Sequence, residues 1–235
     1  MSDHQLLNVA AHRDLRVRRE RSADLGDGVM TALIVPDEFR QVQASYPILF
    51  RQNRERTGYV ALALFGFDAG ENLFLDGDRW DAPYLPLSID IQPFLIGGVP
   101  GADATPKAVI DLASPRIATD DGVRIFDREG RPSPYLEVTL ERLGALDAGY
   151  RGSAAFLDAL DRYQLLEPFT LEVTLDDGAT NRLVGFHAIA EERLAELDAA
   201  TLGKLNADGH LLPLYMAVAS LANFPALIAR KNRRG

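Results

Sequence analysis

The chain of 235 residues is long enough for one substantial domain with a buried core, or for two small ones. Its net charge of −9 argues against general binding to the nucleic-acid backbone and against adhesion to anionic lipid, because both require a basic surface. The absence of cysteine excludes disulfides, thiolate zinc sites, iron–sulfur clusters and cysteine nucleophiles.

The N-terminal segment is polar and basic. Between Met1 and Arg21 it contains His4, His12, Arg13, Arg16, Arg18 and Arg19. No apolar run occurs within this segment. A secretory signal needs an apolar run, so we expect a cytoplasmic protein. Because residues 1–28 show little hydrophobic pattern, we expect them, and the first ~20 above all, to be loosely ordered apart from a possible short strand near Leu6–Val9.

Short strands dominate the prediction for the N-terminal half. Val29–Val35 is the first, and Pro36-Asp37-Glu38 then begins a helix that ends near Ser45. The run YVALALFG is apolar on both faces and predicts a strand inside a sheet. The predicted strands after the helix are Ile48–Arg51, Tyr59–Gly66, Asn72–Leu75, Phe94–Gly98 and Ala108–Leu112, with an exposed loop at Gly97–Ala102.

Helices are expected mainly in the C-terminal half. Apolar residues recur every three or four positions from Leu136 to Tyr150, which predicts a helix with one buried face. Ser153 is expected to cap a second helix that carries Phe156 and Leu160. Two short helices are predicted at residues 191–197 and 198–206, the second capped by Asp198.

A hairpin separates these helices. Phe169 to Leu175 alternate apolar and polar side chains, which is typical of a strand with one buried face. Asp176–Ala179 predicts the turn, and Leu183–His187 the partner strand. The sequence therefore predicts one α+β domain over residues 1–235, with a mixed or antiparallel sheet and helices concentrated in the C-terminal half.

The last apolar stretch, LLPLYMAVASLANFPALIA from Leu211 to Ala229, carries no charge and is followed by a basic end. Its length just suffices for a membrane span, but prolines and asparagine interrupt it and alanine supplies much of it. We expect a helix over residues 211–222 that is buried on most sides and kinks near Pro225. A membrane span and partial exposure as an oligomer contact stay open as alternatives.

Aromatic side chains near carboxylates suggest one ligand or partner site. Asp76 and Asp78 precede Trp80 and Tyr84, and Phe94 follows. A calcium loop is excluded, because Leu87 stands where the bidentate glutamate belongs. We expect a contact surface over Asn72–Pro93 with Trp80 and Tyr84 as anchors.

Metal and catalytic motifs are weak. His12 and Asp14 have the spacing of a facial-triad iron site, with His187 or His210 as a distal ligand, but they lie outside any patterned strand. The chain lacks a phosphate loop and a nucleophile elbow. We therefore expect no metal, no cofactor and no assignable catalytic residue.

Several segments also occur in a familiar order and spacing. They are Tyr46–Phe50, Gly70–Asp76, Trp80, Tyr84–Pro86, Pro93-Phe94, Ile110-Asp111, Leu165–Pro168, Gly185–His187, Glu192–Leu194, Leu214-Tyr215 and Ser220–Asn223. In this respect the chain resembles the bacterial SapC family over about residues 5–230. The resemblance implies a name shared with a surface-layer component and relatives that look like companions of outer-membrane receptor, cupin-like and flavin-dependent halogenase genes.

Together these features predict a non-enzymatic accessory or binding protein of the SapC type, acting with a partner protein or a small ligand. Nucleic acid and membrane insertion are not expected, and a homo-oligomer is compatible with the sequence. Two alternatives stay open. One is an enzyme, either associated with a metal-dependent oxygenase or a hydrolase that uses carboxylates, and the other is a surface-layer subunit.

Overall fold

The computed structural model describes residues 2–53, 55–97 and 107–234, so the predicted loop at Gly97–Ala102 lies almost wholly outside the described residues. The chain divides into two compact units. Unit 1 comprises residues 1–28, 75–81 and 87–148, and unit 2 comprises residues 29–74, 82–86 and 149–235. Each unit is built from separate stretches of chain, and the single domain over residues 1–235 stays a prediction.

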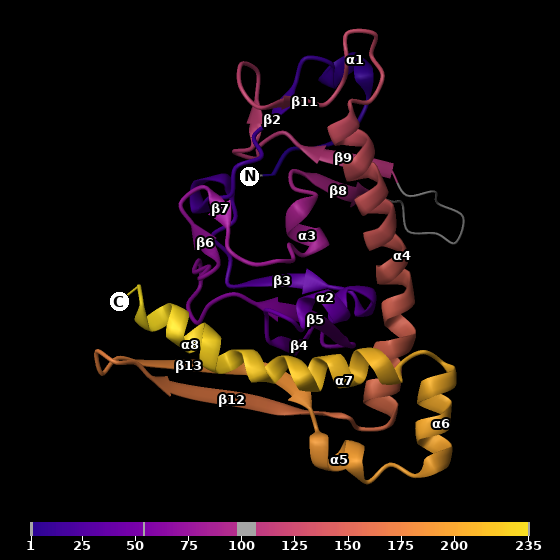
Figure 1. The fold of residues 1–235 in the computed structure, drawn as a ribbon. Helices are drawn as coiled ribbons and strands as arrows, with labels where there is room; N and C mark the ends of the chain where they lie inside the picture. Colours follow the sequence, from indigo (N-terminus) through magenta and orange to yellow (C-terminus); the bar gives the residue numbers. More distant parts are fainter. Residues whose placement is uncertain (1, 54, 98–106, 235) are drawn as a thin grey trace. The chain divides into compact units, whose positions relative to one another are not determined.

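Unit 2 contains an antiparallel five-stranded sheet in the order β12-β13-β4-β5-β3 (Figure 1). Its strands are β3 (Thr31–Ile34), β4 (Ile48–Gln52), β5 (Tyr59–Leu64), β12 (Leu166–Thr174) and β13 (Thr180–Ile189). β5 lies between β4 and β3, and Ala61–Leu64 are all buried, as its two-sided apolar pattern predicts. The hairpin of β12 and β13 also confirms the alternation seen in the sequence.

The helices of unit 2 follow the predicted starts closely. They are η2 (Pro36–Glu38), α2 (Phe39–Val42), α5 (Glu191–Ala195), α6 (Ala199–Ala207), α7 (Leu211–Ser220), η3 (Leu221–Asn223) and α8 (Phe224–Asn232). Asp198 caps α6, because its carboxylate accepts a hydrogen bond from the Thr201 amide at 2.7 Å. The α+β class, with antiparallel sheets and helices in the C-terminal half, is confirmed.

The segments α7, η3 and α8 form one run along the β12–β13 hairpin, which we call the C-terminal run (Leu211–Asn232; Figure 1). The expectation that it is buried on most sides is wrong. One face packs inward through Leu214, Ala217, Ser220, Phe224 and Leu227, whereas Leu212 and Tyr215 are 53% and 48% exposed. By length and composition the run could cross a membrane, a test that core helices and signal sequences also pass.

The longest helix is α4 (Pro134–Arg162), a single helix of 29 residues where the sequence predicts two. Ser153 does not cap a second helix, because its buried hydroxyl donates to the Gly149 carbonyl at 2.7 Å within the same helix. Gly149 explains the close approach of this helix to Val35, since a Cβ at position 149 would lie 2.5 Å from Val35 Cγ2. α4 contributes residues 134–148 to unit 1 and residues 149–162 to unit 2.

Unit 1 is built from small antiparallel sheets in the orders β1-β9-β8, β10-β2-β11 and β6-β7. The strands are β1 (His4–Leu6), β2 (Arg16–Val17), β6 (Leu75–Asp76), β7 (Arg79–Trp80), β8 (Phe94–Gly97), β9 (Lys107–Asp111), β10 (Ile117–Ala118) and β11 (Val123–Arg124). The short helices are α1 (Val9–His12), η1 (Ala23–Leu25) and α3 (Leu87–Asp90). The predicted strands near Phe94 and Ala108 are confirmed as β8 and β9.

The N-terminal segment, residues 2–28, contains regular elements of unit 1, and the loose order expected for it stays a prediction. β1 pairs with β9, and β2 is the middle strand of its sheet. Arg116, which is 1% exposed, donates to the carbonyls of Arg18 at 3.1 Å and Glu20 at 2.9 Å and forms a salt bridge with the buried Asp27. Hydrogen bonds and a salt bridge from Arg116, which is distant in sequence, thus stabilise this segment in place of the apolar packing that it lacks.

Candidate functional site

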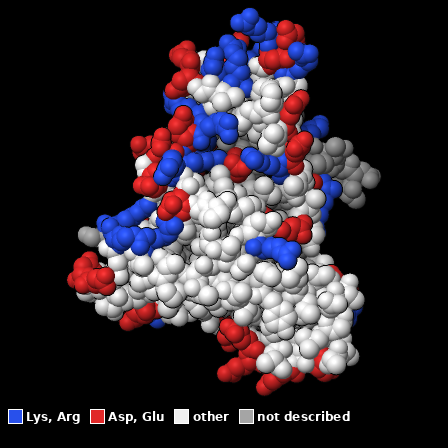
Figure 2. Space-filling view, in the orientation of Figure 1, with Lys and Arg blue, Asp and Glu red and all other residues white. Residues whose placement is uncertain are grey.

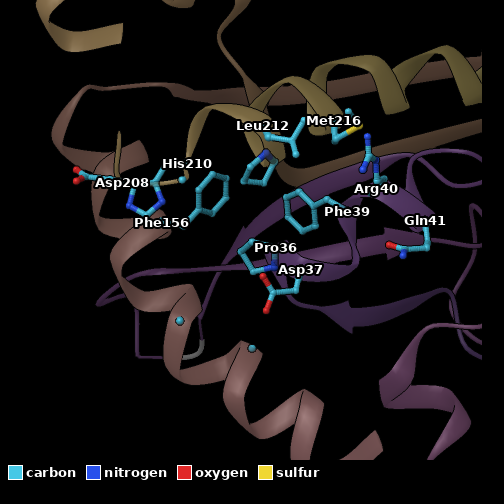
Figure 3. Close-up of a pocket in the computed structure, with 14 residues that line it drawn as sticks. Pro36, Asp37, Phe39, Arg40, Gln41, Phe156, Asp208, His210, Leu212 and Met216 are labelled. Carbon is cyan, nitrogen blue, oxygen red and sulfur yellow. The ribbon is translucent and has the colours of Figure 1, made fainter. Parts of the chain in front are cut away.

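Unit 2 holds a cavity of about 480 Å³ between α2, α4 and the start of α7, which we call the α2–α4–α7 cavity (Figure 3). The residues that line it come from four parts of the chain: Pro36–Gln41, the α4 turns around Gly149–Phe156, the α6–α7 connection, and α7 itself. All of them belong to unit 2. A cavity of this size is suited to a small organic molecule.

The aromatic floor of the cavity is formed by Phe39 and Phe156, which are 0% and 1% exposed. Their ring centroids lie 5.8 Å apart with an interplanar angle of 87°, an edge-to-face arrangement. In Figure 3 the two rings occupy the centre of the site, with His210 beside Phe156 and Arg40 at the opposite end. The floor is therefore rigid and apolar, and its ends are polar.

The η2–α2 turn supplies polar side chains on one side. Glu38 points inward, where its carboxylate accepts a hydrogen bond from the Val35 amide at 3.1 Å. Asp37, Arg40 and Gln41 line the cavity instead, and their side chains form no hydrogen bond or ion pair within the described parts of the chain. Their donors and acceptors are available to a bound molecule.

His210 lies opposite this turn. Gly209 ends α6 with a φ of +76°, a left-handed conformation that suits glycine, and the His210 amide then donates to the Leu205 carbonyl at 2.8 Å. The imidazole packs edge-on against Phe156 with centroids 5.8 Å apart. Across residues 2–53, 55–97 and 107–234, its ring nitrogens have no hydrogen-bond partner. The backbone therefore positions His210 while its imidazole stays available.

Two glycines of α4 face the cavity. Gly149 is required by the packing against Val35, but a Cβ at Gly152 would meet no atom within 4 Å. Glycine inside a helix is less favourable than alanine by about 0.5–1 kcal/mol, so packing gives no reason for Gly152. The absent side chain keeps this wall of the cavity open.

This arrangement fits a molecule with an apolar or aromatic body and a polar or charged end. The body would lie against Leu212 and Met216, the apolar side chains that are open to the cavity, and the end would meet Arg40, Asp37 or His210 according to its charge. Among the described residues, no group of three or more histidines, aspartates or glutamates is placed to hold a metal ion. The arrangement thus favours binding through aromatic contact and hydrogen bonds.

The sequence-predicted residues Asp76, Asp78 and Trp80 lie together on the β6–β7 hairpin of unit 1. Asp76 is exposed and pairs with Arg79 at 3.6 Å, and Trp80 is half-buried opposite Leu75 in the hairpin. The backbone carbonyl of Asp78 accepts a hydrogen bond from the Arg21 amide at 2.9 Å. A contact surface over Asn72–Pro93 stays a prediction.

Tyr84 and Phe94 are placed differently from those three. Phe94 belongs to unit 1 but is fully buried in β8, which leaves it no exposed surface for a partner. Tyr84 belongs to unit 2, where its hydroxyl donates to the buried Glu38 carboxylate at 2.9 Å and its carbonyl accepts from the Tyr46 hydroxyl. Both side chains contribute to the internal packing of their units.

The histidine motif near the N-terminus serves local structure. His12 is 1% exposed, and its Nδ1 accepts a hydrogen bond from the Asn8 amide at 3.1 Å at the start of α1. The Asp14 side chain is 90% exposed and lies 3.7 Å from Arg124. One side chain is therefore buried and the other points to solvent.

The basic end of the C-terminal run is bound to the loop at residues 68–74. Lys231 contacts Asp68 at 2.7 Å and Glu71 at 2.6 Å, and Arg234 donates to the Asn72 carbonyl at 2.9 Å. Burial alone would lower the pKa of Lys231, but the hydrogen bonds to Asp68 and Glu71 raise it. These contacts bind the end of α8 to the loop at residues 68–74 within unit 2.

Few features of the sequence predict the cavity. Asp37 belongs to the predicted helix start, Phe156 belongs to a predicted helix, and His210 is considered only as a distal ligand of an iron site. The only local signal is the pair Gly149 and Gly152 inside a helical pattern, which indicates a packing or functional reason for glycine.

A family model described as SapC matches residues 7–227. No curated protein and no solved structure matches the chain. The matched range includes every residue that lines the α2–α4–α7 cavity.

Proposed function

The chain belongs to the SapC family, and we propose that it is a non-enzymatic binding protein that holds a small amphipathic molecule in the α2–α4–α7 cavity. One observation carries the proposal: a rigid aromatic floor is combined with side chains whose polar groups are not engaged elsewhere in the described chain. Small-molecule sites are typically apolar pockets with a few polar groups that orient the ligand.

The ends of the cavity define what fits. Arg40 favours a carboxylate, sulfonate or phosphate, since a guanidinium binds such groups through two parallel hydrogen bonds. Leu212 and Met216, which line the cavity together with the buried rings of Phe39 and Phe156, favour an aromatic or branched aliphatic body. We therefore propose an amphipathic organic anion as the ligand class, with His210 as a second contact to its polar part.

Binding is favoured over catalysis by the surroundings of His210. A catalytic histidine is usually held by a carboxylate and placed against a nucleophile. The Asp208 carboxylate instead pairs with Lys204 at 3.3 Å, and within the described residues the imidazole contacts the Phe156 ring rather than a hydroxyl or carboxylate.

The proposal is tested with a fluorescent aromatic sulfonate, anilinonaphthalene sulfonate, titrated against the full-length protein. We expect saturable, one-to-one binding that simple aromatic carboxylates displace. Gly152→Leu should abolish it by filling the cavity, and leucine is a good helix former, so α4 should be retained. Arg40→Ala should weaken binding about 10-fold or more, as expected for the loss of a charged hydrogen bond.

The matched control is Arg162→Ala, which removes an exposed arginine at the end of α4 outside the cavity. It should leave the affinity unchanged. If Gly152→Leu binds the sulfonate as tightly as the parent protein while its circular dichroism stays native, the cavity is not the site and the proposal fails.

A further inference from the structure

The outward face of the C-terminal run is unusual for a surface helix. Its exposed positions are Leu212, Tyr215, Ala219, Ala222, Pro225, Ala226 and Ala229, and apart from Pro225 they recur every three or four residues along the run. No charged residue occurs between Leu211 and Ala229. Figure 2 shows the surface over α7 and the adjoining part of α8 as an uncharged area.

Such a face indicates a partner. A helix at the surface of a soluble monomer normally turns charged and polar residues outward, and a continuous exposed apolar patch marks an interaction site. The spacing of three and four residues is that of a seam which packs against another helix. The many alanines allow a helix backbone to approach closely.

The order of large and small residues along the seam selects one arrangement. Leu212 and Tyr215 lie at its beginning, and Ala226 and Ala229 lie at its end. A second identical run in antiparallel orientation would place each large residue of one copy against a small residue of the other. A parallel copy would oppose large to large and leave a gap between the alanines.

The charged side chains near the two ends of the C-terminal run also favour the antiparallel orientation. Arg233 continues the seam at its C-terminal end, is exposed, and has no side-chain partner within the described chain. Acidic side chains, Asp37 and Asp208, lie near the N-terminal end of α7 around the α2–α4–α7 cavity. Antiparallel pairing brings Arg233 of each run towards these acidic side chains of the other copy and aligns the helix dipoles favourably.

We propose that this face is the contact between two copies of the chain, which pair their C-terminal runs antiparallel about a two-fold axis. Identical chains associate most often with this symmetry, because one patch then serves both copies. In this arrangement residue 212 of one copy faces residue 229 of the other, residue 215 faces residue 226, and residue 219 faces residue 222. The two-fold axis therefore passes between Ala219 and Ala222.

A lipid surface fits the face less well. Alanine gains little from insertion into a bilayer, and the basic end of α8 is bound to the loop at residues 68–74. The acidic turn at Asp176 lies against it, since the Asp176 amide donates to the Asn232 side chain at 3.2 Å. Anionic headgroups would meet these carboxylates.

The first experiment measures the mass of the full-length protein by sedimentation velocity over ~1–100 μM, the range expected for a modest interface. We expect a dimer whose dissociation constant rises about 100-fold or more in Ala222→Arg, because the substitution buries an unpaired charge at the axis. Ala200→Arg, the same change at an exposed alanine of α6, is the matched control and should dimerise normally.

Single cysteines test the orientation, because the chain has none of its own. Ala222→Cys should form a disulfide-linked dimer on mild oxidation. Ala229→Cys should not, because a rise of 1.5 Å per residue separates the two copies of position 229 by about 25 Å in the antiparallel pair. Efficient cross-linking of both variants would contradict the antiparallel arrangement.

A monomer over the whole concentration range, an Ala222→Arg protein that still dimerises, or co-sedimentation with phosphatidylglycerol vesicles that Ala222→Arg prevents would each overturn the proposal. The proposed ligand is tested separately, since Ala222 does not line the cavity. Leu212 belongs to both surfaces and is therefore left unchanged.

Discussion

The N-terminal segment and the C-terminal run reverse the usual relation between polarity and burial. The first is rich in arginine, yet it is tied into the sheets of unit 1, and the arginine that binds it, Arg116, is 1% exposed. The second is uncharged over Leu211–Ala229, yet Leu212 and Tyr215 are about half exposed.

The difference follows from where each segment finds its partners. The N-terminal segment offers backbone carbonyls, and a buried guanidinium with several donors can satisfy them together with Asp27. The C-terminal run has apolar residues on every side, but the sheet and helix α2 of unit 2 leave part of its surface uncovered. Polarity thus predicts which groups need partners, whereas the fold decides whether those partners are within the chain.

The largest effect is expected at Arg116. Arg116→Ala would leave the buried Asp27 carboxylate without its salt bridge and would remove donors from two carbonyls, at a loss of about 3–5 kcal/mol of unfolding free energy. Urea denaturation followed by circular dichroism measures it. Arg131→Ala removes an exposed arginine paired with Asp127 and should change stability by less than about 1 kcal/mol. Equal losses in both variants would show that burial does not distinguish them.

The next-largest effect is expected at Ser220, on the buried side of the C-terminal run. Ser220 is fully buried, and its hydroxyl accepts from the Ile48 amide at 2.8 Å and donates to the Ala217 carbonyl at 2.6 Å. Ser220→Ala leaves that amide unpaired at the edge of β4 and should lower stability by about 1–3 kcal/mol in the same assay. Ser45→Ala, at a half-buried serine, is the control and should have little effect. A neutral Ser220→Ala would mean that water replaces the hydroxyl.

The strands of the unit 2 sheet, β8, β9 and most helix starts were predictable, because period-two alternation and Asp198 as an N-cap are local signals. The two-residue strands of unit 1 were not, and the strand expected at Asn72–Leu75 begins only at Leu75. Three further features were not predictable. Arg116 is far in sequence from the carbonyls it binds. Ser153 reads locally as a cap, although its hydroxyl finds the Gly149 carbonyl inside α4. The cavity brings Arg40, Phe156 and His210 together from separate elements, and no local pattern records that meeting.

Two glycines on one helix allow a smaller and sharper test. Gly149→Ala places a methyl group 2.5 Å from Val35 Cγ2 and should destabilise the protein by about 1–3 kcal/mol despite the better helix propensity of alanine. Gly152→Ala meets nothing within 4 Å and should stabilise it by about 0.5–1 kcal/mol. Opposite signs in thermal and urea unfolding would confirm that packing requires only Gly149. If Gly152→Ala also lowers the stability, the added methyl group contacts neighbouring atoms, which contradicts the open space beside Gly152.

The smallest effect concerns acid stability. His187 lies on β13 with its ring edge-on to Tyr59 at 4.9 Å, and its Nδ1 is buried without a partner among the described residues. Burial lowers the pKa of His187 from its ordinary value of 6.5, so the unfolded chain binds this proton more tightly than the folded protein. The stability contribution is therefore present above pH 6.5 and is lost as the pH falls toward the lowered folded pKa. His187→Gln cannot titrate there, and its unfolding free energy should fall less steeply than that of the parent protein between about pH 7 and pH 5. Parallel curves for the two proteins would show that His187 is protonated as readily in the fold as in the unfolded chain.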